Sequence, residues 1–162
     1  GMLPEYQGWN AHQLHDESSH VLETVLAIAK ILGVNVVLDA TMKTGKSIVD
    51  KVDDFKASGF RVEAHYMHLP RQEAAKRAVG RFLNGGEKGR FVPPEVVMGN
   101  TKNEANFDAI KKKADAWSFH DNSGEKGSGP KMIASKGKPA TVAEHVLSKS
   151  AKPVILFVAK RS

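Results

Sequence analysis

The sequence predicts a single α/β domain built on a parallel sheet with flanking helices. Short apolar runs of strand length, such as Val34–Asp39 and Arg61–Leu69, alternate with longer segments whose apolar residues recur at helical spacing. Strands that alternate with helices in this way favour a parallel sheet with right-handed crossovers. A length of 162 residues suits one core. We therefore expect residues 1–162 to form one domain.

Composition narrows the class of protein. A hydrophobic content of 41% with 26% charged residues is ordinary for a soluble globular protein, and no apolar run is long enough to span a bilayer. The chain has no cysteine and no secretory signal pattern, so we expect a cytoplasmic protein without disulfides or thiolate metal sites. The net charge of +6 is typical either of a polyphosphate-binding surface or of an ordinary solvated one.

The first expected helix covers residues 13–32 and ends at Gly33. Its apolar residues fall on one face at helical spacing, which predicts that this face packs against the core. The polar residues of the opposite face include Glu23. The residues predicted to face inward are Leu14, Val21, Val25, Ile28, Ala29 and Leu32.

The other elements follow from the same two periodicities and from Gly and Pro boundaries. The pattern Thr101-x-x-Glu104 predicts a capping box at the start of one of them. In chain order they are strand Val34–Asp39, helix 46–57, strand Arg61–Leu69, helix Arg71–Phe82, a short helix at Glu95–Gly99, helix 103–114, strand Ala116–His120, strand Lys131–Ala134, helix Val142–Leu147 and strand Pro153–Ala159. The residues of these helices predicted to face inward are Ile48, Val52, Phe55, Ala74, Ala78, Phe82, Phe107, Ile110 and Ala114.

The segment Ala40–Ser47 resembles a phosphate-binding P-loop. It follows a buried strand, opens a helix and fits G-x-x-x-x-G-K-[ST] at every fixed position except the first, where Ala40 stands. In a working P-loop, Lys46 would reach the terminal phosphates of ATP and Ser47 would bind magnesium.

Several features argue against that interpretation. Ala40 replaces the Gly of the tight turn, the loop then contains a single Gly, and the carboxylate of Asp39 would repel phosphate. A long helix also precedes the strand. We therefore expect the nucleotide site elsewhere and keep Lys46 and Ser47 as cofactor-binding candidates only if this loop is a P-loop.

The carboxyl ends of parallel strands are where such sheets bind ligands. Asp39, Thr41 and Lys43 lie at one predicted strand end, and His68 and Arg71 lie near another. The histidines of the first helix do not share one face, so no metal site is expected.

Three stretches together resemble a known family. HDESSHVLETVLAIAKILGVNVVLDATMKT, FRVEAHYMHLPRQEAAKRAVGRF and GRFVPPEVV are similar, in order and spacing, to the zeta toxin family. Its members are P-loop kinases of the bacterial toxin–antitoxin type that phosphorylate UDP-N-acetylglucosamine. The resemblance covers about residues 2–121 and implies a P-loop-kinase-like fold.

The resemblance also implies roles for particular residues. Glu23 matches the glutamate that contacts the sugar, and Asp39, Thr41 and Lys43 match the run that follows the strand and orients the substrate. The family has Arg where Lys43 stands, which argues against a bidentate phosphate contact here. Two arginines that neutralise the transferred phosphoryl group match Arg81 and Arg90, although Gly80 replaces the Glu that usually precedes the first.

The family's own P-loop, first strand and catalytic base precede the segment that matches Leu3-Pro4-Glu5-Tyr6. From the start at Met2 we expect these parts to be missing, and ATP and Mg²⁺ to serve the complete enzyme without binding tightly to this chain. The strands Val34–Asp39 and Arg61–Leu69 should then lie parallel, either paired directly or separated by one strand supplied by another segment or another chain.

Three hypotheses about function remain open. The first is a zeta-toxin-like kinase domain, inactive as this chain, with a small-molecule sugar nucleotide and an antitoxin protein as partners and no membrane or nucleic acid. The second is a non-catalytic remnant that binds a sugar nucleotide or an antitoxin. The third is another P-loop phosphotransferase that uses Ala40–Ser47.

Overall fold

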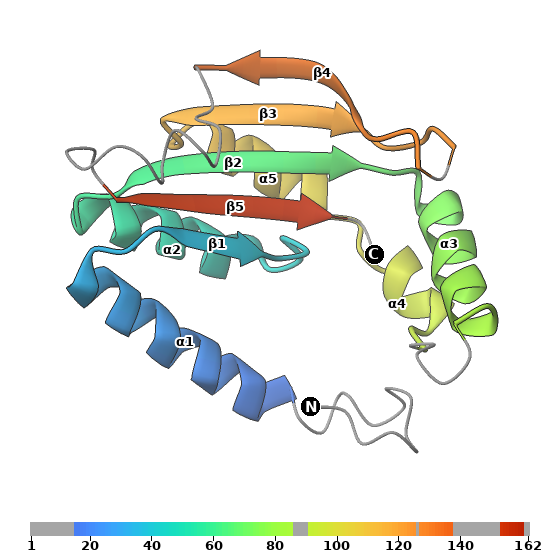
Figure 1. Cartoon of the computed structure of the whole chain (residues 1–162), viewed down its shortest axis with the longest axis horizontal. Coiled ribbons are helices and arrows are strands. Elements are labelled where there is room, and N and C mark those ends of the chain that lie inside the picture. The colour runs from blue at the N-terminus through green and yellow to red at the C-terminus, as the bar shows by residue number, and fades with distance from the viewer. Residues whose placement is uncertain (1–14, 86–90, 126, 138–152, 161–162) are drawn as a thin grey trace.

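The computed structural model describes residues 15–85, 91–125, 127–137 and 153–160 (Figure 1). The predicted helix Val142–Leu147 and the candidate Arg90 lie outside these residues. The described elements alternate between helix and strand over most of the chain, as the sequence predicts. In chain order they are α1 (His15–Leu32), β1 (Val36–Asp39), α2 (Gly45–Ala57), β2 (Arg61–His68), α3 (Arg71–Leu83), α4 (Pro94–Met98), α5 (Asn103–Lys111), β3 (Ala116–Asp121), β4 (Lys131–Lys136) and β5 (Val154–Lys160).

The five strands form one sheet in the order β1-β5-β2-β3-β4. β5 pairs in parallel with β1 on one side, where Val36 faces Ile155, and with β2 on the other, where Arg61 faces Val154. β1 and β2 are therefore parallel and separated by one strand that comes from the C-terminal part of the same chain. This confirms the α/β class and the expected parallel direction of the two strands, and of the two expected arrangements it is the one with a strand between them.

The edge strand β4 departs from the parallel pattern. It pairs antiparallel with β3, with a register shift between Phe119 and His120. The connection from β3 to β4 is a short turn-rich segment without a helix, and a chain that returns without a crossover must run antiparallel.

The core lies between one face of the sheet and the helices α2 and α5 (Figure 1). Tyr66 of β2 stacks on Phe107 of α5 at 5.1 Å between ring centroids and on Phe119 of β3 at 5.5 Å. These helices bury the residues that their periodicity predicts: Ile48, Val52, Phe55, Phe107 and Ile110 are all buried.

Of the described residues of α1 that were predicted to face inward, only Ala29 is buried, and the rest of the prediction is wrong. Val21, Val25, Ile28 and Leu32 are exposed by 60%, 54%, 50% and 67%, while Leu26 and Ala29 are buried. Ion pairs from Glu23 to Lys51 and from Lys30 to Asp54 join α1 to α2 through the side that was predicted to be polar. Because α1 carries apolar residues over a wide arc, periodicity identified the helix without identifying which side would find a partner.

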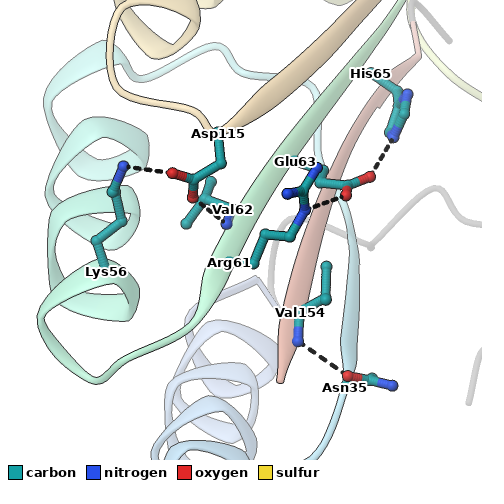
Figure 2. A network of polar contacts seen from close by, with 8 residues as sticks. All are labelled: Asn35, Lys56, Arg61, Val62, Glu63, His65, Asp115 and Val154. Carbon is teal, nitrogen blue, oxygen red and sulfur yellow. Dashed lines mark hydrogen bonds and ion pairs between the residues drawn. The ribbon is translucent and has the colours of Figure 1, made fainter. Parts of the chain in front are cut away.

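Side-chain contacts with the backbone fix the amino ends of the strands (Figure 2). Asp115, just before β3, accepts a hydrogen bond from the N–H of Val62 at 2.9 Å and pairs with Lys56 at 3.1 Å. Burial raises the pKa of Asp115, but the Val62 N–H and the Lys56 ammonium outweigh it and hold that pKa below its ordinary value. The polar residues at the amino ends of the strands thus stabilise the fold, and they lie at the edge of the sheet opposite to the candidate site.

Candidate functional site

The loop that follows β1, residues 40–44, carries two of the predicted substrate residues, Thr41 and Lys43, and Asp39 directly precedes it. Thr41 and Lys43 are exposed on either side of Met42, which is buried in the core, and Asp39 is exposed at the end of β1. The N–H of Ala40 donates to the carbonyl of Val158 in β5. The structure therefore brings Asp39, Thr41 and Lys43 together at the carboxyl edge of the sheet, as predicted.

Glu23 connects α1 to the first turns of α2. Its carboxylate pairs with Lys51 at 2.7 Å, and the Lys51 ammonium also donates to the hydroxyl of Ser47 at 3.2 Å. The side chain of Glu23 is 58% exposed, so the pair contributes at most about 1 kcal/mol to stability. Glu23 and Ser47 are thus linked through a shared lysine that sequence analysis did not single out.

Ala40–Ser47 has the strand, loop and helix of a P-loop but departs from it in two details. Ala40 stands where Gly lets the backbone of a P-loop approach phosphate closely. The hydroxyl of Ser47, which would bind Mg²⁺, accepts a hydrogen bond from the Lys51 ammonium at 3.2 Å. On the carbonyl side of the loop, Asn106 from α5 lies so near Gly45 that a Cβ there would be 2.2 Å from its Oδ1. The residues at this loop therefore fit ATP and Mg²⁺ poorly.

Arg81 lies in a different part of the same edge. α3 begins just after β2, and its buried Ala74 and Ala78 pack with Leu69 and with Val97 of α4. The helix borders a cavity of about 830 Å³ between α3 and the connection from β3 to β4. The cavity is lined by Leu69, Glu73, Ala74, Arg77, Ala78, Gly80, Arg81, Asn84, Gly85, Asn122, Ser123, Gly124 and Glu125.

Arg77 holds one wall of this cavity in place. Its guanidinium donates to the carbonyls of Asn122 at 3.0 Å and Gly124 at 2.7 Å, and it pairs with Glu73 at 3.0 Å. Arg81 follows one helical turn later and is exposed. Sequence analysis missed Arg77, although its spacing of four from Arg81 on a short helix was a visible signal.

The carboxyl ends of β2 and β3 meet the start of α5. Nδ1 of His68 lies 2.8 Å from a carboxylate oxygen of Glu104. The predicted capping box at Thr101-x-x-Glu104 is therefore wrong, because α5 starts at Asn103 after Lys102 without a side-chain cap and Glu104 turns to the sheet. In the part of the chain that the structure describes, no group of three acidic or histidine residues could hold a metal ion.

The strands β1, β5, β2 and β3 end at the same edge of the sheet (Figure 1). The candidate residues Asp39, Thr41 and Lys43 lie at this edge at the end of β1, and the cavity that Arg81 borders lies beyond β2 and β3. The family model described as Zeta toxin matches residues 1–125. The chain belongs to the zeta toxin family.

Zeta toxin membership indicates a kinase-like phosphotransferase, and the mostly parallel sheet with flanking helices is consistent with its P-loop-kinase-like fold. Comparisons with curated proteins and with solved structures gave no match. No helix among the described residues has the length and apolarity needed to cross a membrane.

Proposed function

We propose that this zeta toxin domain binds a nucleotide sugar, such as UDP-N-acetylglucosamine, as the acceptor of a phosphoryl group. The observation that carries the proposal is the cavity of about 830 Å³ that Arg81 borders at the carboxyl edge of the sheet. Its size is within the range of about 300–1,000 Å³ typical of small-molecule sites. The charged residues that line it are Arg77, which pairs with Glu73, and Arg81 and Glu125, so the cavity offers both a cation and a carboxylate to a phosphorylated sugar.

Glu23, Asp39, Thr41 and Lys43 do not line this cavity. They lie toward β1 and α1, and in this proposal they orient the part of the acceptor that extends out of the cavity along the edge of the sheet. Thr41 offers a hydroxyl and Lys43 an ammonium from the same exposed loop, and Asp39 and Glu23 offer carboxylates to sugar hydroxyls. Lys43 makes a point-charge contact with phosphate rather than a bidentate one. Arg81, with Arg90 outside the described residues, would neutralise charge that develops on the transferred group.

We expect the chain to bind the acceptor without transferring phosphate. The family reaction draws its phosphoryl group from ATP with Mg²⁺. At Ala40–Ser47, Ala40 replaces the first Gly of a P-loop, and the Lys51 ammonium donates to Ser47, the residue that would bind Mg²⁺. Positioning and charge neutralisation supply nearly all of the rate acceleration in phosphoryl transfer, so this loop should not support turnover.

Isothermal titration calorimetry with UDP-N-acetylglucosamine tests the binding step. We expect Lys43→Ala to weaken binding by about tenfold, the equivalent of one lost charge-assisted contact. Lys46→Ala, also exposed and three positions later, is the matched control and should leave binding unchanged. Absence of binding to the parent chain would refute the proposal.

A second assay tests the absence of transfer. The chain is incubated with ATP, Mg²⁺ and UDP-N-acetylglucosamine, and ADP is measured. We expect no turnover above background. Clear turnover that is lost in Lys46→Ala would instead establish Ala40–Ser47 as a working P-loop.

A further inference from the structure

The side-chain amide of Asn106 in α5 donates two hydrogen bonds to the backbone of the loop at residues 40–44. Nδ2 of Asn106 donates to the carbonyl of Met42 at 2.7 Å and to the carbonyl of Lys43 at 3.2 Å. The partners are more than 60 positions apart in sequence, so this contact is a tertiary one that fixes the loop relative to the core helix. Two donor contacts from one amide hold two successive peptide units in one orientation.

Because Gly45 has no side chain, the Asn106 amide can lie beside it. A Cβ at position 45 would lie 2.2 Å from Oδ1 and 2.9 Å from Cγ of Asn106, which is closer than any real Cβ contact. The whole amide would have to move, because an Asn side chain is too short to bend away at its tip alone. Gly45 and Asn106 therefore form a matched pair.

The hydrogen bonds from Asn106 hold the loop where Met42 adopts a left-handed backbone conformation. Its backbone has a φ of 53°, a left-handed conformation that costs energy for any residue with a side chain, and its side chain is 2% exposed. With Met42 turned into the core, the neighbours Thr41 and Lys43 face outward. In a trans peptide the C=O and the following N–H point in opposite directions, so the N–H groups of Lys43 and Thr44 point away from Asn106.

We infer that Asn106 is a positioning residue that holds the loop at residues 40–44 so that Thr41 and Lys43 face the acceptor substrate. The inference rests on the proposed function for the identity of that substrate, a nucleotide sugar. Asn106 itself lies behind the loop, against its carbonyls, and acts through the loop rather than by touching the ligand. Preorganising the loop lowers the cost of ordering it on binding.

A double-mutant cycle tests the matched pair without any ligand. Gly45→Ala should lower the thermal unfolding midpoint of the parent by about 2–4 °C, because it displaces the Asn106 amide. In the Asn106→Ala background the same change should leave the midpoint unchanged or raise it, since the clash is gone and Ala favours helix over Gly. An equal drop in both backgrounds would overturn the inference.

Binding and loop order are then measured together. Asn106→Leu keeps the branching at Cγ but lacks the donors, and Asp108→Asn on the exposed side of the same helix is the control. We expect Asn106→Leu to weaken UDP-N-acetylglucosamine binding about tenfold. The methyl NMR signal of Met42, in protein labelled at methionine methyl carbons, should broaden or shift in this variant without ligand, and Asp108→Asn should change neither readout.

The two readouts separate the two proposals. If the parent does not bind UDP-N-acetylglucosamine, the proposed function is wrong and the Met42 signal alone decides whether Asn106 holds the loop. If the parent binds but Asn106→Leu binds equally well, or if the Met42 signal is unchanged in that variant, Asn106 does not position the loop.

Discussion

The backbone N–H of Val154 donates a 2.9 Å hydrogen bond to the side-chain oxygen of Asn35, which lies 119 positions earlier in the chain (Figure 2). Asn35 precedes β1 and Val154 begins β5, so the contact aligns the first residues of two neighbouring strands. On the other side of β5, the N–H of Arg61 donates to the carbonyl of Pro153 at 2.9 Å. Because β5 separates β1 from β2, its start sets the register of both pairs.

Replacing Asn35 tests this alignment. Asn35→Ala should lower the free energy of unfolding by about 1 kcal/mol, because the Val154 N–H loses its acceptor. Asn35→Asp keeps an acceptor oxygen and should cost clearly less. Urea denaturation at neutral pH measures both. Equal losses in the two variants would show that the hydrogen bond does not contribute.

The exposed and buried sides of α1 give a second prediction. Leu26→Ala should lower the free energy of unfolding by about 2–4 kcal/mol, since Leu26 is 4% exposed within the core. Val25→Ala, one position away on the exposed side, should change it by less than about 0.5 kcal/mol. The comparison uses the same denaturation assay. A larger loss for Val25→Ala would mean that this side of α1 is covered in solution.

Local sequence patterns predicted most of the elements and the residues that α2 and α5 bury. Ile48, Val52 and Phe55 recur at helical spacing on a helix with one apolar stripe, so periodicity had one answer. The carboxyl-edge location of Asp39, Thr41 and Lys43 followed from the rule for parallel strands. On α1, whose apolar residues cover a wide arc, periodicity placed most of the residues that it predicted to be buried on the exposed side.

Contacts between segments that are far apart in the chain could not be predicted from the sequence. Nothing in the segment Val154–Lys160 says that it pairs between β1 and β2, and the family resemblance left open whether these two strands would pair directly or have another strand between them. Glu104 matched a local capping pattern but bonds His68 instead, because the end of β2 brings a better partner. Asn106 gave no signal, since an amide on a polar helix position is ordinary until the fold places it over Gly45.

A serine between two histidines gives a third prediction. The hydroxyl of Ser118 lies 2.6 Å from Nδ1 of His65 and 2.7 Å from Nε2 of His120, and Ser118 is 1% exposed. Burial lowers the pKa of both imidazoles below their ordinary value of 6.5, although Glu63 partly opposes this at His65. With neutral rings, the hydroxyl can donate to one ring and accept from the other.

The stability of the folded chain should therefore depend on these rings in mildly acidic solution. Below about pH 6.5 the unfolded chain binds protons at imidazoles that stay neutral in the folded chain, so stability falls as the pH falls from about 6.5 toward the lowered pKa values, below which the folded rings bind protons too. Urea denaturation at about pH 7.5 and about pH 5.5 should show this loss in the parent and a smaller one in His120→Gln. His20→Gln on α1 is the control. An unchanged pH dependence in His120→Gln would contradict the assignment.

Arg77 and Arg81 lie one turn apart on α3 and should behave differently when replaced. Arg77→Ala should lower the free energy of unfolding by about 1–3 kcal/mol, because the carbonyls of Asn122 and Gly124 lose their donor and Glu73 loses its partner. Arg81→Ala removes an exposed side chain and should change that free energy by less than about 0.5 kcal/mol. Because Arg81 borders the cavity that is proposed to bind the phosphorylated ligand, its loss should also weaken UDP-N-acetylglucosamine binding by about tenfold. Thermal unfolding and calorimetry measure both effects, and a destabilisation by Arg81→Ala as large as that by Arg77→Ala would make Arg81 a structural residue of the cavity wall.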